Sequence, residues 1–383
     1  MRNHLSGNAH CVAWNHRLLQ VGRKRSASRV ACRGISVAKP IAVRGAGVGN
    51  EIIPWAKALI AARELRMHPA PPLWLLNRYG LAREFGISRV RMTGMTAATA
   101  FLPRIVVSEE MFRSTSAWDY GSAIRILSSQ GVFPRKLFCL VSEGMWGGYL
   151  AIRSTRNFLL HKVLASPGVL EHLEALGIPS PNTVTIAVHV RRGDFLGEAP
   201  RPGQFNRALP MDWYRSAMLS LAQSLRAVPL RFIVVSDSPT EDLSFDIAGH
   251  EVLHISGSPL DDLAVLATSD VLISSVSSFS MLAAFLSDAP YLWYRNQLTD
   301  VKGYLSIWGH EQAQKSDGSP TLSAVCEPDE YQASRGIPYA IGDGLPEWLP
   351  ERLKDTYAIR RLSRDLIYYG AVTSQPKLTR EAP

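Results

Sequence analysis

Between residues 183 and 295, short apolar runs alternate with segments whose apolar residues recur at helical spacing. The apolar runs are TVTIAVHV (183–190), RFIVVS (231–236), EVLHIS (251–256), DVLISS (270–275) and PYLWYR (290–295). Helical spacing is present in 211–226, where Asp212 is the predicted N-cap, and in 259–269 and 278–288. Apolar strands that alternate with helices predict a parallel sheet covered on both faces. We therefore expect a Rossmann-like domain over 181–300.

The N-terminal half contains one similar unit. The stretch PIAVRGAGVGNEIIPWAKALIAAREL (40–65) predicts a strand, a glycine-rich turn and a helix, with Pro54 in the first helical turn, where proline is tolerated. Several helices interrupted by Pro and Gly follow between 66 and 180, and PSPN (179–182) is the predicted linker. We therefore expect a second Rossmann-like domain over 40–180, with a cleft between the two. Residues 301–383 are predicted to form a loop or helical segment and a tail.

Charge is distributed unevenly along the 383 residues. The net charge is +9, but residues 1–50 hold nine Arg or Lys and no acid, which leaves 33 basic and 33 acidic residues for the rest. A formally neutral body argues against a nucleic-acid-binding groove. Residues 1–39 are predicted to be a basic, disordered extension. A transit peptide and a misassigned start remain alternatives, and the extension could touch an anionic membrane surface.

Cysteine and hydropathy patterns favour a reducing, cytoplasmic location. The longest uncharged stretch, 271–287, carries six serines and is too polar and too short to span a bilayer. The four cysteines show neither a CxxC motif nor metal-ligand spacing, so neither a disulfide framework nor a zinc site is expected. The protein is predicted to be cytoplasmic, with at most peripheral contact with the inner face of a membrane. The sequence does not define an oligomeric state.

The first polar cluster is VHVRRGDF (188–195), at the end of a predicted strand. Strand alternation places His189 and Arg191 on one face and Arg192 on the other, just before Gly193 lets the chain turn. Two guanidinium groups at a strand end match a diphosphate, which needs several donors close together. A structural salt-bridge network of the two arginines with Asp194 is the alternative. Glu198 on the following loop supplies a further carboxylate.

Two further clusters follow other predicted strands. In SSVSSFS (274–280), Ser277 and Ser278 can cap a helix whose free N–H groups face an anion; ordinary N-capping is the alternative. In VVSDSPTED (234–242), Ser236 and Asp237 end a buried strand, a position suited to hydrogen bonding with a ribose or base. A simple Asx turn is the alternative there.

The fourth cluster is the glycine-rich turn RGAGVGNE (44–51). Its glycine spacing departs from the G-x-G-x-x-G fingerprint of dinucleotide-binding proteins. Glu64, about twenty residues further on, falls inside the predicted helix and not at a strand end, where a ribose-binding acid is expected. NAD binding is therefore not expected. The turn could still bring its backbone close to another ligand, with Asn50 supplying a side-chain amide.

Taken together and in this order, the four clusters resemble the inverting fucosyltransferases with an HxRRxD-type motif. These are the α1,2-fucosyltransferases and the related α1,6- and protein O-fucosyltransferases. HVRRGD (189–194) matches the first motif, and GAGVGNE (45–51) is similar to the G-x-x-GNQ turn, with Glu51 where glutamine is usual. FIVVSDS (232–238) and DDLAVLATSDVLISSVSSFSMLAAFL (261–286) resemble two later blocks, with Met281 and Leu282 in place of two tryptophans. MDWYRSAM (211–218) is similar to a further helix of the α1,2 group.

The resemblance implies an α/β, GT-B-like fold and metal-independent, inverting transfer of fucose from GDP-fucose to a glycan. It implies that Arg191 stabilises the departing diphosphate, that Asp194 orients Arg192 or the loop, and that Glu198 is the general base. The expected donor-binding residues are Gly47, Gly49, Asn50, His189, Arg192, Asp194, Ser236, Asp237, Ser277, Ser278, Phe279 and Ser280. No metal ligands and no cofactor beyond the donor substrate are expected. A different nucleotide sugar, or nucleotide or glycan binding without catalysis, remains an alternative.

Overall fold

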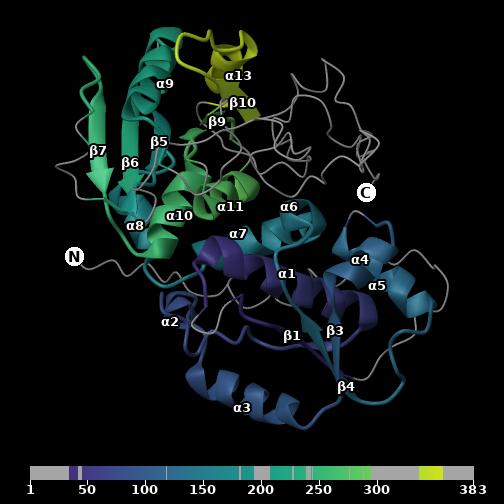
Figure 1. The fold of residues 1–383 in the computed structure, drawn as a ribbon. Coiled ribbons are helices and arrows are strands. Elements are labelled where there is room, and N and C mark those ends of the chain that lie inside the picture. The colour runs from purple at the N-terminus through teal and green to yellow at the C-terminus, as the bar shows by residue number, and fades with distance from the viewer. Residues whose placement is uncertain are drawn as a thin grey trace, which may run out of the picture. The chain divides into compact units, whose positions relative to one another are not determined.

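The computed structural model contains two parallel β-sheets (Figure 1). It describes residues 34–41, 45–117, 119–180, 183–193, 208–226, 228–238, 243, 245–275, 277–287, 289–294 and 336–356. Both sheets lie in one unit of the chain, Cys32–Pro383. The described strands thus form the parallel α/β arrangement that a GT-B-like fold requires, and the predicted fold class is confirmed.

The first sheet has the strand order β2-β1-β4-β3, and the second has the order β10-β9-β8-β5-β6-β7. The first is built from β1 (Gly34–Ala38), β2 (His68–Pro69), β3 (Arg104–Val107) and β4 (Phe138–Ser142). The second is built from β5 (Val184–Val190), β6 (Leu230–Ser236), β7 (Glu251–Ile255), β8 (Val271–Ile273), β9 (Tyr291–Tyr294) and β10 (Gly336–Tyr339). Every pair of neighbouring strands is parallel.

Helices lie between most of the consecutive strands, which is the usual connection for parallel pairing. In the first half they are α1 (Val48–Leu65), α2 (Leu81–Glu84), α3 (Arg89–Ala100), α4 (Glu109–Ser114), α5 (Tyr120–Ser129), α6 (Gly148–Ala151), the 3₁₀ helix η2 (Arg153–Thr155), α7 (Arg156–Leu164) and α8 (Val169–Ala175). In the second half they are α9 (Met211–Ser224), α10 (Pro259–Thr268), α11 (Ser278–Leu286) and α13 (Trp348–Thr356). Among the helices of the described ranges, none combines the length and apolarity needed to cross a bilayer.

Helix α1 is one of the elements that link the two halves. Fifteen of its 18 residues are buried, because it packs on α5, β1 and β4 and also contacts α11 of the second half. The other face of the first sheet has a smaller core, made by Val37, Ala70, Cys139 and Val141 with Met95 of α3 packed against it. Alternating residues of β1 and β4 therefore point to α1 on one side and to α3 on the other.

Three local predictions are wrong. The first strand is Gly34–Ala38 and ends before Pro40, which has no N–H to donate to a sheet; the predicted extension 1–39 therefore includes this strand. Pro54 lies in the interior of α1 and not in its first turn, because the helix begins at Val48. The N-cap of α9 is Pro210, and Asp212 occupies the first turn.

Candidate functional site

The carboxyl ends of β5, β6 and β8 form the edge at which three of the four polar clusters meet. In the observed register His189 pairs with Val235, Val190 pairs with Ser236, and Val188 pairs with Ile273. The residues that follow these strands are therefore neighbours across the sheet. Ligands of open parallel sheets bind beyond this edge. The predicted juxtaposition of the arginine pair, Asp237 and the serine-rich turn is present.

Asp237 organises the arginine pair. Its Oδ2 atom lies 2.9 Å from Arg191 Nη1, and its Oδ1 atom accepts a 2.9 Å hydrogen bond from the backbone N–H of Arg192. A side chain at Gly193 would collide with this carboxylate, so the glycine makes room for it. The Arg191 and Asp237 side chains remain 28% and 25% exposed, so the ion pair is open to solvent and to a ligand.

The guanidinium of Arg192 is less fully paired than that of Arg191. Within the described part of the chain its buried Nε atom has no hydrogen-bond partner. A buried donor without an acceptor is costly, and a bound anion would relieve that cost. Asp194, the acid that was expected to orient this arginine, lies outside the described residues, as does Glu198.

His189 is buried and neutral. Its Nδ1 atom lies 2.7 Å from Ser275 Oγ, and its ring lies 5.3 Å from the ring of Phe279. Burial, with a smaller contribution from the nearby Arg191 charge, lowers the pKa of His189 to about 3. The imidazole therefore adds no positive charge to the site at neutral pH. It connects the end of β5 to the serine turn.

The serine turn is a hydrogen-bonded network at the N-terminus of α11. Ser277 caps the helix by accepting a 3.2 Å hydrogen bond from the N–H of Ser280, which confirms the capping part of the prediction. Ser275 donates to Ser277 Oγ at 3.2 Å, and Ser274 and Ser280 are joined at 2.5 Å. The cluster thus uses its hydroxyl groups to fix the turn, and the first N–H groups of α11 are oriented by it.

The glycine-rich turn meets the same helix N-terminus from the other sheet. Gly47 is the N-cap of α1, and Gly49 packs so closely on the backbone of Ser278 and Phe279 that a Cβ atom would overlap it. The hydroxyl of Tyr149 lies 3.0 Å from the carbonyl oxygens of both Gly49 and Ser278 and donates to them. The fourth cluster therefore joins the other three.

Asn50 lies in the first turn of α1, beside this contact, and is half-buried. Because Pro54 has no N–H, the Asn50 carbonyl does not receive the hydrogen bond that an α-helix normally supplies four residues on. The interior position of Pro54, which the sequence prediction placed in the first turn, thus changes the backbone hydrogen bonding at Asn50. Both the side-chain amide and this main-chain carbonyl of Asn50 belong to the junction of the two halves.

Glu51 is a structural residue of this junction that the sequence did not reveal. Its buried carboxylate accepts hydrogen bonds from the N–H groups of Ile41 (3.0 Å) and Ala46 (2.8 Å) and from Trp74 Nε1 (3.3 Å). Asn77 holds the same turn by donating to the Ala46 carbonyl at 3.0 Å. A carboxylate suits this place because it also faces the positive end of the α1 dipole.

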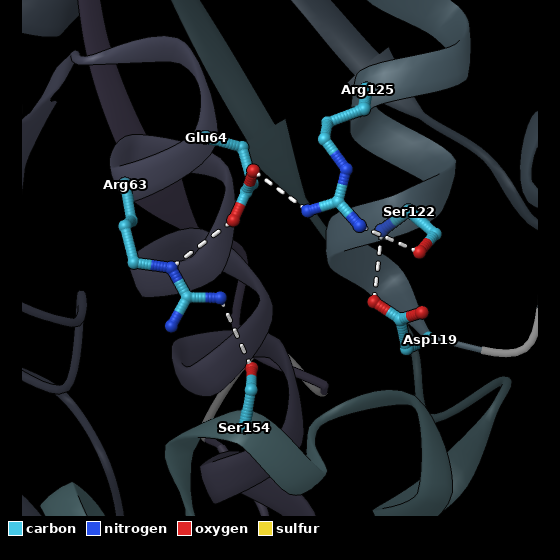
Figure 2. Close-up of polar contacts among 6 residues, drawn as sticks. All are labelled: Arg63, Glu64, Asp119, Ser122, Arg125 and Ser154. Carbon is cyan, nitrogen blue, oxygen red and sulfur yellow. Dashed lines mark hydrogen bonds and ion pairs between the residues drawn. The ribbon is translucent and has the colours of Figure 1, made fainter. Parts of the chain in front are cut away.

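Two other predicted residues have structural partners. Ser236 Oγ accepts a 3.0 Å hydrogen bond from the N–H of Ser238, a local turn made by the serine hydroxyl and not the Asx turn that was the alternative to ligand binding. Glu64 lies between two arginines, at 3.2 Å from Arg63 Nε and 2.9 Å from Arg125 Nη1, with its side chain 4% exposed (Figure 2). This position explains why Glu64 is not available as a ribose ligand.

The described residues hold no group of three or more His, Cys, Asp or Glu side chains with a metal-binding arrangement. The anion-binding groups on this edge are instead the two arginines and the N–H groups of α11. Such groups are suited to a phosphorylated ligand, because a helix N-terminus and guanidinium forks both favour negative charge.

Residues 142–298 match the model of a protein family described as Glycosyl transferase family 11. The matched segment covers less than half of the chain but includes the arginine pair, Asp237 and the serine turn. A search of curated protein sequences found no match.

Among solved structures, fucosyltransferase NodZ from Bradyrhizobium is 15% identical, covering 67% of this chain and 94% of its own, with a TM-score of 0.36. NodZ α-1,6-fucosyltransferase soaked with GDP-fucose is 14% identical, with 67% and 93% coverage and a TM-score of 0.34. The glycosyltransferase SnogD from Streptomyces nogalater is 15% identical, with 69% and 82% coverage and a TM-score of 0.27. At these values the structural likenesses assign no residue roles to this chain.

The resemblance to fucosyltransferases that the four clusters predict is confirmed by the family match, which spans three of them. The protein is a glycosyltransferase whose segment 142–298 matches the model of glycosyl transferase family 11.

Proposed function

We propose that this protein transfers fucose from GDP-fucose to a hydroxyl group of a glycan, with inversion and without a metal ion. The observation that carries the proposal is the meeting of Arg191, Arg192 and the N-terminus of α11 at one edge of the second sheet. These groups together match the two phosphates of a nucleoside diphosphate sugar. The family match supports fucose as the transferred sugar.

In inverting transfer the acceptor hydroxyl attacks C1 of the sugar while GDP departs from the opposite face. The C1–O bond to the β-phosphate breaks, its electron pair stays on GDP, and negative charge grows on the phosphate. Arg191 is held by Asp237 through Nη1, so its remaining N–H groups are oriented before the reaction begins. Preorganised donors of this kind typically contribute about 10²- to 10³-fold to turnover.

The supporting donors come from three elements. Arg192 brings the buried Nε atom without a partner in the described chain, and α11 brings the first free N–H groups after the Ser277 cap. Asn50 adds its amide from α1. Positive charge and dipoles then do the work for which other glycosyltransferases use a metal ion.

Transfer also requires a group that takes the proton of the acceptor hydroxyl. His189 is unsuited to this role, because its pKa of about 3 makes it a weak base and it is buried against Ser275. A carboxylate is better suited, and we assign the role to Glu198 in the segment that follows the arginine pair.

The proposal is tested by incubating the protein with GDP-fucose and glycan acceptors, and by titrating it with GDP, UDP and ADP in a calorimeter. We expect preference for GDP, activity unaffected by EDTA, and a loss of about 10²-fold or more for Arg191→Ala. Arg215→Ala is the matched control, because Arg215 makes an exposed i,i+3 ion pair with Asp212 on the surface of α9. Preference for UDP, or activity abolished by EDTA, would contradict the proposal. GDP binding without any turnover would favour a non-catalytic protein.

A further inference from the structure

The solvent-exposed side of helix α3 carries large apolar residues. Val90 and Phe101 are 82% and 91% exposed. They are eleven residues apart, which at 100° per residue places them within about 20° of each other on the same side of the helix. The opposite side carries the buried Met92 and Thr99, and Met95 packs against the core residues of the first sheet.

The segment that carries these two apolar residues is basic. From Phe85 to Ser108 every charged residue is an arginine, namely Arg89, Arg91 and Arg104. All three are exposed, and none forms an ion pair with an acid of the described chain. Ordinary exposed helices alternate charges of both signs, so a face with this composition indicates a partner.

A second segment extends the same surface. Residues 135–137 (Arg135, Lys136 and Leu137) are exposed, and Leu137 is 52% exposed. These residues precede β4 and lie next to the segment that connects α3 with β3. The backbone N–H of Cys139 donates a 2.8 Å hydrogen bond to the Pro103 carbonyl, and Cys139 pairs with Arg104 in the sheet. The α3 patch therefore consists of three apolar residues (Val90, Phe101 and Leu137) and five cations (Arg89, Arg91, Arg104, Arg135 and Lys136).

We propose that the α3 patch docks this protein on an anionic lipid membrane surface. Exposed apolar side chains enter the headgroup region, and arginine and lysine around them pair with lipid phosphates while their stems lie along the apolar boundary. A soluble polyanion would use the cations but gain nothing from Phe101 and Val90. A second copy of the same face would bring like charges together.

The place of the patch in the fold is compatible with function. Helix α3 covers the face of the first sheet opposite to α1, and its C-terminal end and residues 135–137 lie at the amino-terminal ends of β3 and β4; the glycine-rich turn belongs to the α1 side and follows the carboxyl end of β1. Docking therefore leaves the candidate site uncovered. The proposal does not depend on the identity of the sugar donor.

The test is sedimentation of the full chain with vesicles of phosphatidylcholine alone or with 30% phosphatidylglycerol. We expect binding to the anionic vesicles that weakens as salt is raised. Arg89→Gln/Arg91→Gln should weaken it by about 30-fold, since each basic residue near such a surface contributes about fivefold. Val90→Ser/Phe101→Ser should weaken it by about tenfold or more.

Matched controls are Arg113→Gln on α4 and Leu170→Ser on α8, which change exposed residues outside the patch. Circular dichroism and the glycosyltransferase assay with a soluble acceptor show that each variant remains folded and active. No binding of the wild type, equal binding to both vesicle types, or unchanged binding of both patch variants would overturn the proposal. If both patch variants bound anionic vesicles as tightly as the wild type, the basic segment 1–33 would be the candidate for membrane contact. Dimerisation abolished by Val90→Ser/Phe101→Ser in sedimentation velocity would identify a second copy as the occupant and also overturn it.

Discussion

Asp237 holds Arg191 across two neighbouring strands: its Oδ2 atom lies 2.9 Å from Arg191 Nη1, while Oδ1 receives the backbone N–H of Arg192 at 2.9 Å. One carboxylate from the end of β6 thus fixes both the side chain and the main chain at the end of β5. The sequence predicted that Asp237 contacts a ribose or a base. The geometry makes it a positioning residue for the arginine pair, and this difference can be measured.

Asp237→Asn should lower turnover much more than it lowers GDP affinity. The amide still accepts the Arg192 N–H, but it loses the charged partner of Arg191, and misplacement of a catalytic group costs about 10²-fold in rate. Loss of the negative charge beside the phosphate site offsets part of the lost orientation in binding, so the GDP dissociation constant should change by less than about threefold.

Calorimetry with GDP and the rate of fucose transfer give the two quantities for Asp237→Asn. Asp212→Asn is the control, since Asp212 is an exposed acid of α9 whose side chain is 82% exposed. If GDP affinity and turnover fall by the same factor, Asp237 contacts the nucleotide directly.

Two glycines that lie inside helices should respond to substitution by alanine in opposite ways, because only one of them lies at the contact between the two halves. Gly49→Ala should destabilise the protein by about 1 to 3 kcal/mol, because a Cβ atom there overlaps the Ser278 backbone and must force α1 and α11 apart. Gly94→Ala on α3 should instead stabilise by about 0.5 to 1 kcal/mol, since a Cβ atom there meets no atom within 4 Å.

Urea unfolding of the wild type and both glycine variants tests these two predicted changes in stability. The two free energies of unfolding should move in opposite directions. Stabilisation by Gly49→Ala would mean that the close approach of the two helix N-termini is not required for the folded state.

The location of the site could be predicted from the sequence, but its internal pairing could not. The apolar runs 183–190, 231–236 and 270–275 place three polar clusters on one edge, because parallel strands share the direction of their carboxyl ends. The sequence offered Asp194 as the partner of the arginine pair, and Asp194 lies outside the described residues. The register between β5 and β6 brings Asp237, which was expected to contact the ligand, to Arg191.

The first half was harder to predict for a physical reason. Strands β3 (RIVV) and β4 (FCLVS) have four and five residues, and such short apolar runs cannot be told from buried helix by periodicity. The role of Glu51 was likewise hidden, because its three donors come from residues 41, 46 and 74 and converge only in the fold.

Tyr149→Phe should weaken the contact between α1 and α11. The phenol hydroxyl is buried and donates to the carbonyls of Gly49 and Ser278, so its removal should cost about 1 to 3 kcal/mol in the free energy of unfolding. Tyr79→Phe, which changes an exposed phenol, should stay within about 0.5 kcal/mol of the wild type. Urea titrations of the three proteins provide the values, and equal stability of both variants would show that the bridge contributes nothing.

His189 should make the protein less stable as the pH falls from about 6.5 to about 3. Its pKa is 6.5 in the unfolded chain and about 3 in the folded protein, where burial and the Arg191 charge oppose protonation. Over this window the unfolded state therefore binds more protons than the folded state, and the free energy of unfolding falls by up to about 1.4 kcal/mol per pH unit. Asp262 acts in the opposite sense, because burial raises its pKa from 3.8 to about 6 and its contribution is lost as the pH rises through that range.

The two contributions are separated by comparing the wild type with His189→Gln, in which Asp262 is unchanged. Glutamine stays neutral and can still hydrogen-bond to Ser275, so the variant should lose less stability than the wild type on acidification. Urea unfolding at half-unit intervals between pH 8 and pH 4 gives the difference, which should grow steadily below pH 6.5 and be constant above pH 7. Parallel curves over the whole range would mean that His189 takes up its proton equally easily in the folded protein, and that the site carries a positive charge in addition to those of Arg191 and Arg192 in mild acid.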